Sequence, residues 1–347
     1  MAFQELSERE RRVLEAVIQS YVETAEPAGS RTISRRFGLG VSPATIRNTM
    51  SDLEEKGYLY HPHTSAGRVP TDIAYRLYVD SLMHVTPIAS SDRDRLAEQL
   101  AAGGGSTIEA ILRRAAQTLS VLTQELGMAV GPRLDQTVLH RLELVRLSSE
   151  RLVLVLTLRG GAVRTIFVEV SEQIADNALA EVSVVLNERL AGLTLREIRS
   201  SLAARLRDAN AIPSGHELLN IFLQEGETIF DDPLRNDESL VLGQASVLAE
   251  QPEFSSSEKM RRLIALTESN EHLAELLRRR PVTPGISITI GNEHGDPRFE
   301  NFTIVTSEYR AGSLAGVIGV IGPTRMPYEK VVAIVAHTSR LVSDLLD

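Results

Sequence analysis

The chain has 347 residues, enough for two or three domains, and contains no cysteine, which excludes disulfides and thiolate metal sites. Hydrophobic residues make up 43% and charged residues 24%, which is typical of a folded globular protein. No apolar run approaches the roughly 18 residues that a membrane-spanning helix needs, and the polar N-terminus is not typical of a signal peptide. These features predict a cytoplasmic protein with no membrane partner.

The net charge of −9 argues against nucleic acid as a partner, but its sign reverses locally. Between residues 28 and 76 there are seven Lys and Arg residues against four Asp and Glu, a net charge of +3. Contact with phosphates requires a local basic face, and the charge of the rest of the chain matters less. Charge alone therefore leaves nucleic acid open as a partner.

The first predicted helix begins at Ser7 and Glu10, which have the spacing of a capping box. Apolar side chains then recur on one face at helical spacing. Ser30 caps a short second helix over about residues 31–37, and the glycine-rich turn at 38–40 ends it. A long helix, a short helix and a tight turn are the first parts of a helix-turn-helix.

A third helix is predicted to start at Ser42–Pro43, an N-cap residue followed by the residue favoured at the first helical position. It ends near Lys56–Gly57, where a glycine follows a cation. Residues 58–60 alternate like a strand, and the turn-rich segment 61–68 leads to a possible return strand at Val69 and a further helix through about residue 84. The order predicts a winged helix-turn-helix over roughly the first 85 residues.

In such a fold the third helix enters the major groove of DNA. Ile46, Met50 and Leu53 fall on one face that must pack against the other helices, so the opposite face points outward. There Arg47 can bond guanine in bidentate fashion and Asn48 can bond adenine. The candidate DNA contacts on the second helix, the third helix and the wing are Arg31, Arg35, Ser42, Thr45, Arg47, Asn48, His63, Thr64 and Arg68. Each alone is also compatible with an ordinary solvated helix or loop, so the prediction depends on their joint placement.

The remaining two thirds of the chain mixes helices and strands. Residues 86–91 and 101–106 are typical of flexible linkers, with a short helical piece between them. The later elements suggest a sheet-based sensor domain interrupted by an insertion. In chain order we predict a helix at 107–126, strands at 137–147, 152–158 and 162–169, helices within 171–226, a strand at 244–248, a helix at 257–280, strands at 286–290, 299–306 and 312–321, and a helix at 327–346.

The sequence contains no motif typical of catalysis. It has no G-x-x-x-x-G-K-[ST] loop, no H-E-x-x-H, no G-x-S-x-G and no cysteine nucleophile. The glycines at 103–105 are not followed by lysine, and the acidic pair Asp231–Asp232 is typical of a solvated turn. His61 and His63 lack further ligands nearby in the sequence, which disfavours a metal site. We expect neither an enzyme nor a cofactor.

Two long segments resemble those of a known family. The first is SPATIRNTMSDLEEKGYL, from Ser42, running into HPHTSAGRVPTDIAYRLYVDSLM. The second is GVIGVIGPTRMPYEKVVAIV, from Gly316 to Val335. Both resemble the heat-inducible transcription repressor family, HrcA, and the resemblance covers nearly the whole chain. Ala74 departs from the pattern by one methyl group, since glycine is expected there.

The resemblance implies an α+β multidomain fold. Its parts are a winged helix-turn-helix at 1–85, a linker at 86–106, a GAF-like α/β sheet domain formed by 107–170 and 256–347, and an inserted α/β dimerisation domain at 171–255. It also implies a homodimer that binds double-stranded DNA at an inverted-repeat operator of chaperone genes and loses repression on heating. The chaperonin is implied as the partner that keeps the repressor active. DNA contact is implied for Ser42, Thr45, Arg47, Asn48, His63 and Arg68, and no ligand is implied for the GAF-like domain.

Two rival functions remain open from the sequence. One is a repressor gated by a small molecule, with the GAF-like domain as effector sensor; a pocket lined by convergent polar groups would favour it. The other is a protein-binding module whose winged helix contacts protein instead of DNA. Binding that weakens steeply with salt and is specific for a palindrome would separate this module from an operator-binding repressor.

Overall fold

The computed structural model describes residues 5–63, 66–84, 87–102, 108–132, 137–159, 163–170, 174–207, 216–230 (the side chains of 225–228 excepted), 240–257, 260–261, 264–265, 273–274, 276–277, 285–312 and 314–346. The chain forms two compact units. The first unit comprises residues 1–130, 240–309 and 317–344, and the second comprises 131–239 with 310–316 and 345–347. None of the helices in the described part of the chain is long and apolar enough to cross a membrane.

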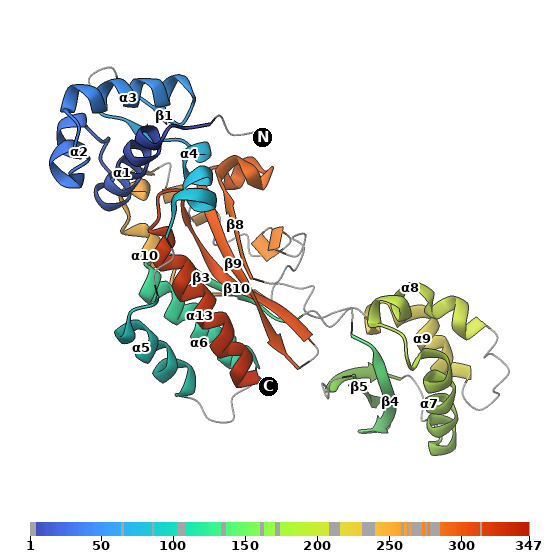
Figure 1. Cartoon of the computed structure of the whole chain (residues 1–347). Coiled ribbons are helices and arrows are strands. Elements are labelled where there is room, and N and C mark those ends of the chain that lie inside the picture. The colour runs from blue at the N-terminus through green and yellow to red at the C-terminus, as the bar shows by residue number, and fades with distance from the viewer. Residues whose placement is uncertain are drawn as a thin grey trace. The chain divides into compact units, whose positions relative to one another are not determined.

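The N-terminal part of the first unit is a small helical bundle with a two-stranded ladder (Figure 1). Its elements are α1 (Glu8–Thr24), α2 (Ser30–Phe37), α3 (Pro43–Glu55), β1 (Leu59–Tyr60), β2 (Val69–Pro70), α4 (Asp72–Leu77) and the π-helical turn η1 (Tyr78–Leu82). The two strands pair antiparallel, with Leu59 opposite Pro70. This is the element order of a winged helix-turn-helix, in which a hairpin follows the third helix.

The rest of the first unit is built on a five-stranded sheet with the strand order β7-β3-β10-β9-β8. The pairs β3–β7, β3–β10 and β8–β9 are antiparallel. The elements are α5 (Ser90–Ala101), α6 (Ile108–Thr123), β3 (Leu126–Val130), β7 (Leu240–Leu242), α10 (Ser246–Ala249), η5 (Pro252–Phe254), β8 (Ile286–Ile290), η6 (Gly291–His294), η7 (Pro297–Phe299), β9 (Phe302–Ala311), β10 (Leu314–Pro323) and α13 (Tyr328–Leu346).

Both faces of this sheet are covered. Helices α6 and α13 lie across one face (Figure 1), where Ser307 of β9 hydrogen-bonds Ser339 of α13 at 2.9 Å. The alternate residues of β9 point the other way, so Phe302 and Ile304 join an apolar core with the opposite face of β3. Phe254 stacks on Phe302 in that core, with ring centroids 5.9 Å apart. The sheet is therefore the middle layer of three.

Helix α6 approaches the sheet unusually closely because two glycines lie beneath it. A Cβ at Gly127 of β3 would lie 2.0 Å from the Ala116 carbonyl oxygen, and one at Gly243 would lie 2.3 Å from Ser120 Oγ. The Ser120 hydroxyl accepts hydrogen bonds from the backbone N–H of Gly127 at 2.8 Å and of Gln244 at 3.2 Å. Glycine is required at these positions because a side chain would push the helix away from the strands.

The second unit pairs a three-stranded sheet with helices. Its elements are β4 (Leu139–Arg146), β5 (Arg151–Leu158), β6 (Val163–Glu169), α7 (Asp176–Leu190), α8 (Leu195–Leu206) and α9 (His216–Ile229). The strands form an antiparallel meander in the order β4-β5-β6. One face of the sheet shares a continuous apolar core with the helices, to which Leu154, Leu186 and Phe222 each contribute a fully buried side chain.

The boundaries of these units differ from the predicted ones. The strands at 139–169 were expected in the sheet domain, but their buried leucines share one core with α7–α9, so the insertion begins near 131. It ends near 239, because Leu240 of β7 packs in the core of the five-stranded sheet. The predicted strand at 244–248 lies mostly in α10, and the strand of this region is β7. The predicted linker at 86–106 contains α5, which packs through buried Leu96 and Leu100.

Candidate nucleic-acid interface

Helix α3 is oriented by three apolar side chains on its inner face. Ile46, Met50 and Leu53 are buried, as their spacing predicts. The opposite face is open to solvent, and Arg47 and Asn48 are both exposed on it. The apolar stripe therefore determines which side chains α3 presents outward.

The N-terminus of α3 is capped by the side chain that the sequence indicates. Ser42 Oγ accepts a hydrogen bond from the Thr45 backbone N–H at 3.1 Å, and the Ser42 and Thr45 hydroxyls are 2.9 Å apart. Pro43 follows at the first helical position. This end of the helix carries the positive end of its dipole, which favours a phosphate group.

The scaffold under α3 is held by a buried carboxylate on α1. Glu10 hydrogen-bonds the Ser7 backbone N–H at 2.8 Å and forms an ion pair with Lys56 at 2.6 Å. Burial raises the pKa of the Glu10 carboxyl, but the hydrogen bonds from Lys56 and Ser7 outweigh it and lower the pKa to about 2. Lys56 is thereby committed to joining the C-terminus of α3 to the start of α1.

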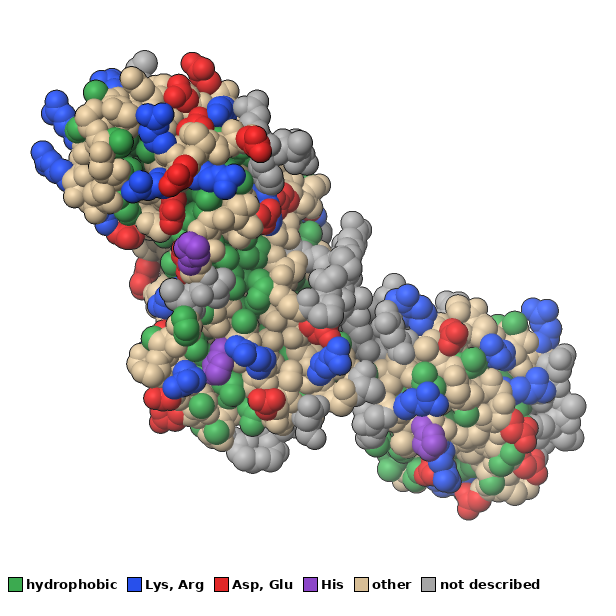
Figure 2. Space-filling model, viewed as in Figure 1, with side chains coloured by type: hydrophobic (Ala, Val, Ile, Leu, Met, Phe, Trp, Pro, Cys, Tyr) green, Lys and Arg blue, Asp and Glu red, His purple; other side chains and the backbone are tan. Residues whose placement is uncertain are grey.

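The cations between residues 28 and 76 fall into two groups. Four have carboxylate partners: Arg36 with Glu23, Lys56 with Glu10, Arg68 with Glu54, and Arg76 with Glu293 and Asp80. Among the described residues, the other three form no ion pair and are exposed; they are Arg31 and Arg35 on α2 and Arg47 on α3. Figure 2 shows Lys and Arg side chains projecting from the region of α2. The unpaired cations of this segment therefore lie on α2 and α3.

The predicted DNA contacts of the wing differ in how accessible they are. The Arg68 side chain is only 12% exposed, and its guanidinium lies 2.8 Å from Glu54 of α3. Its backbone also pairs with Ala28, with N–O distances of 2.8 and 3.0 Å. Arg68 is thus engaged in holding the wing against the bundle. His63 is exposed, and Thr64 lies outside the described residues.

One residue of the wing and one of α4 also have partners within the protein. His61 Nδ1 lies 2.6 Å from Glu54, which therefore contacts both His61 and Arg68. Arg76, which the charge count included in the basic segment, is held by Glu293 and donates to the Ile288 carbonyl at 2.7 Å. The Glu293 carboxylate raises the pKa of Arg76 above its ordinary value. Arg76 therefore joins α4 to the sheet instead of facing outward.

The sequence reasoning left out a second group of cations. Arg9, Arg11 and Arg12 on α1 are exposed, and within the described part of the chain they form no ion pair. The signal that identifies them is the presence of three arginines among the four residues 9–12, near the start of a helix that packs against α3. They add positive charge to the same part of the chain.

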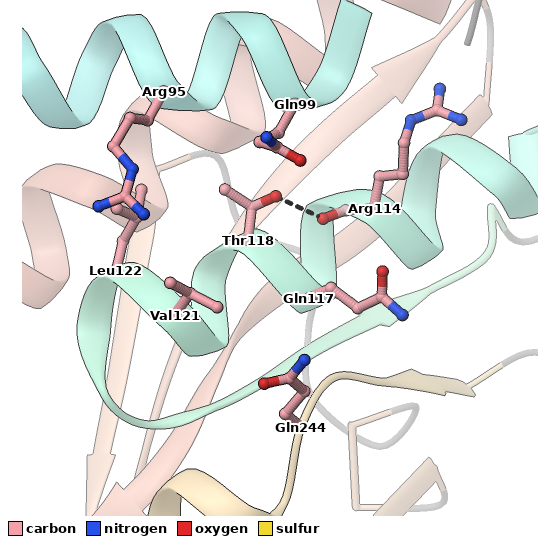
Figure 3. Close-up of a pocket in the computed structure, with 8 residues that line it drawn as sticks. All are labelled: Arg95, Gln99, Arg114, Gln117, Thr118, Val121, Leu122 and Gln244. Atoms are coloured by element: carbon pink, nitrogen blue, oxygen red, sulfur yellow. Dashed lines mark hydrogen bonds between the residues drawn. The ribbon is translucent and has the colours of Figure 1, made fainter. Parts of the chain in front are cut away.

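A polar pocket lies between α5 and α6 in the first unit. Its volume is about 290 Å³, at the lower end of the range typical of small-molecule sites. Figure 3 shows Arg95 and Gln99 entering from α5 and Thr118 from α6. The eight lining residues include two arginines and three glutamines and no acidic side chain: Arg95, Gln99, Arg114, Gln117, Thr118, Val121, Leu122 and Gln244.

The order of the first elements, three helices followed by a two-stranded ladder, is typical of transcription regulators with an N-terminal helix-turn-helix. Residues 109–332 match the family model described as HrcA protein C terminal domain. The chain therefore belongs to the HrcA family, whose members are heat-inducible transcription repressors and not enzymes.

Relatives match this chain along its whole length. The heat-inducible transcription repressor HrcA of Chlorobium phaeobacteroides (strain BS1) is 42% identical, with 100% of both chains covered. That of Geobacter sulfurreducens is 41% identical, with 99% of both chains covered. A crystal structure of a hypothetical protein aligns with a TM-score of 0.59 at 24% identity over 99% of both chains, which supports the fold alone.

Proposed function

We propose that this chain is a dimeric repressor that binds an inverted-repeat operator of chaperone genes in the cytoplasm. The observation that carries the proposal is the placement of Arg31, Arg35 and Arg47 on α2 and α3. All three are exposed, and none has a carboxylate partner among the residues that the structure describes. Cations already paired with carboxylates contribute little to counterion release from DNA, whereas free ones supply it. The acidic net charge of the whole chain does not oppose this proposal, because these free cations are grouped on two neighbouring helices.

The proposed contacts divide by chemistry. Arg47 and Asn48 read base edges in the major groove. Arg31, Arg35 and the N-terminus of α3 with Ser42 and Thr45 contact phosphates, which sets the register of the helix. His63 and Thr64, in the wing, contact the DNA backbone. Arg68 acts indirectly, by holding the wing to Glu54 of α3.

We propose that two copies associate through the open face of the three-stranded sheet. Val145, Val153 and Phe167 lie opposite one another in register across β4, β5 and β6, on the face away from the helices. Phe167 is 67% exposed and Val145 is 45% exposed. The residues of the ion pairs Arg141–Glu143 and Arg151–Glu169 lie on the same face of these strands. An apolar centre with a polar rim is typical of a homodimer interface, and a second copy supplies the same surface.

Dimerisation gives the operator its symmetry, because a two-fold dimer offers one α3 to each half-site. We further propose that heat acts by reducing the population of folded dimer, and that the chaperonin restores it. The free energy of unfolding is small in any protein, so a decrease of about one or two kcal/mol on heating sharply lowers the folded fraction.

The test is a fluorescence-anisotropy titration of labelled inverted-repeat DNA from a chaperone promoter, with scrambled DNA of equal length as control. Tight binding to the repeat that weakens steeply with salt is the expected result, with an enhancement when chaperonin is added. Equal affinity for both DNAs under all conditions would contradict the operator-binding function. Full operator affinity and dimer content through the heat-shock range without chaperonin would contradict direct sensing of heat.

A second candidate function is gating by a small anion, which the pocket between α5 and α6 favours. Its two arginines and three glutamines offer donors to a phosphate or carboxylate, and no lining residue repels it. This candidate predicts that phosphate or succinate raises the melting temperature of the protein, since a ligand stabilises the state it binds. Arg95→Gln is expected to remove the effect, and Arg113→Gln, on the same α6 outside the pocket, to preserve it. If neither anion shifts the melting temperature, gating by a small anion is contradicted, and the proposed operator binding is unaffected.

A further inference from the structure

Arg325 lies in the segment between β10 and α13 and contacts two other parts of the first unit. Its guanidinium forms a two-pronged ion pair with Glu253 of η5, with Nε–Oε1 at 2.5 Å and Nη2–Oε2 at 2.9 Å. The remaining nitrogen, Nη1, donates to the backbone carbonyl of Val22 in α1 at 2.6 Å. One side chain therefore joins the sheet, η5 and the first helix of the DNA-binding bundle.

The contact on α1 occupies a group that the helix itself leaves unpaired. The last four carbonyls of an α-helix have no intrahelical partner, and α1 ends at Thr24. Ala25 N–H donates to the Tyr21 carbonyl and Glu26 N–H donates to the Thr24 hydroxyl, whereas the Val22 carbonyl accepts from Arg325. The last turn of α1 contains no basic residue. Arg325 therefore supplies the cation that the C-terminus of a helix favours.

This contact is largely shielded from water. The Arg325 side chain is 14% exposed and that of Glu253 is 23% exposed. Beside it, Tyr75 of α4 packs on Tyr328 of α13, with ring centroids 5.8 Å apart, and both side chains are buried. Removal of the arginine would leave the Glu253 carboxylate poorly solvated and the Val22 carbonyl without its donor, which is costly in such surroundings.

We propose that Arg325 is a positioning residue for DNA binding, which fixes the α1–α3 bundle on the sheet domain at one orientation. This rests on the proposed operator-binding function. A dimer must place two recognition helices on two half-sites at once, so an orientation fixed in advance saves the cost of ordering them on DNA. Arg325 is largely buried, so we place it outside the surface that contacts DNA. Its effect on affinity passes through the placement of α3.

The absence of cysteine from the chain makes the orientation measurable. Spin labels are attached to cysteines introduced at Thr32 on α2 and Arg113 on α6, which are both exposed, in full-length protein diluted with unlabelled copies. We expect Arg325→Ala to broaden the distance distribution and to weaken binding to the full inverted repeat about tenfold, an ordinary coupling between two parts of a protein. Affinity for a single half-site is expected to stay unchanged.

Two further variants separate positioning from loss of folding. Arg325→Lys keeps the cation but not the fork, so it is expected to restore part of the full-operator affinity. Arg298→Ala removes an exposed ion pair within the sheet domain, between Arg298 and Asp296, and is expected to change neither readout. Equal losses on the full repeat and the half-site in Arg325→Ala would indicate a folding defect and overturn the inference.

The distance measurement is independent of the proposed function. An unchanged distance distribution in Arg325→Ala would overturn the inference whatever the DNA results are. A broadened distribution with full operator affinity would equally overturn the positioning role. If the wild type shows no preference for the inverted repeat, the proposed operator-binding function fails, and the positioning role that rests on it is overturned with it, while the distance result still reports whether Arg325 fixes the bundle.

Discussion

Phe167→Asp is expected to give a folded monomer whose dimer dissociation constant is about a thousandfold higher than that of the wild type. An aromatic residue at the centre of an interface contributes about 2 kcal/mol or more, and a two-fold dimer contains it twice, so about 4 kcal/mol is lost. Phe167 is 67% exposed in the protomer, so its replacement does not empty the core. Analytical ultracentrifugation measures the dissociation constant, and circular dichroism checks the fold.

Loss of the dimer is also expected to weaken operator binding, because two linked sites bind more tightly than one. A monomer engages one half-site at a time, and loss of the second, tethered contact typically costs 10²-fold to 10⁴-fold in affinity. The matched control is Val184→Asp, which places the same charge on α7 of the same unit at a side chain that is 55% exposed. It is expected to remain dimeric. A dimer that tolerates Phe167→Asp but dissociates with Val184→Asp would place the interface on the helices instead of the sheet.

The orientation of α3 was predictable because it depends on local rules. Ile46, Met50 and Leu53 recur at helical spacing, and Ser42 followed by proline determines where the helix begins. These signals lie within one helix, so no distant partner is needed to interpret them. The same holds for the hairpin at 59–70 and for β8, whose bounds match the prediction.

The sheet to which a strand belongs was not predictable in this way. Alternating apolar residues in 139–169 show that one face is buried, but not which helices bury it. Leu154 packs against α7–α9, and only the fold as a whole shows that these strands form a sheet separate from the five-stranded one. The boundary at 170 was placed between two elements that share one core.

Long-range ion pairs were equally inaccessible from the sequence. Arg76 and Arg68 were counted as basic residues of the DNA-binding part, but Arg76 pairs with Glu293, which is 217 residues away, and Arg68 with Glu54. A charge count along the chain treats every cation as free. The structure separates the cations already neutralised from those still available to a phosphate, and this separation sharpens the site.

Simultaneous replacement of Arg31, Arg35 and Arg47 by glutamine is expected to lower operator affinity about 10³-fold at moderate salt. A dimer presents each cation twice, so six contacts are lost. The four made by Arg31 and Arg35 are to phosphates, and the loss of each lowers the magnitude of the slope of log K against log salt by about 0.9. All three side chains are exposed, so the free energy of unfolding is expected to change by no more than about 0.5 kcal/mol per site. Anisotropy titrations at several salt concentrations give the affinity and the slope together.

The sharpest control is the neighbour of one of these residues. Arg35 and Arg36 are adjacent on α2 and chemically identical, but Arg36 is paired with Glu23 and Arg35 has no carboxylate partner among the described residues. Arg35→Gln is expected to reduce both the affinity and the salt slope, and Arg36→Gln to leave both nearly unchanged. Equal losses from the two single variants would mean that total charge, and not the surface formed by the free arginines, attracts the DNA.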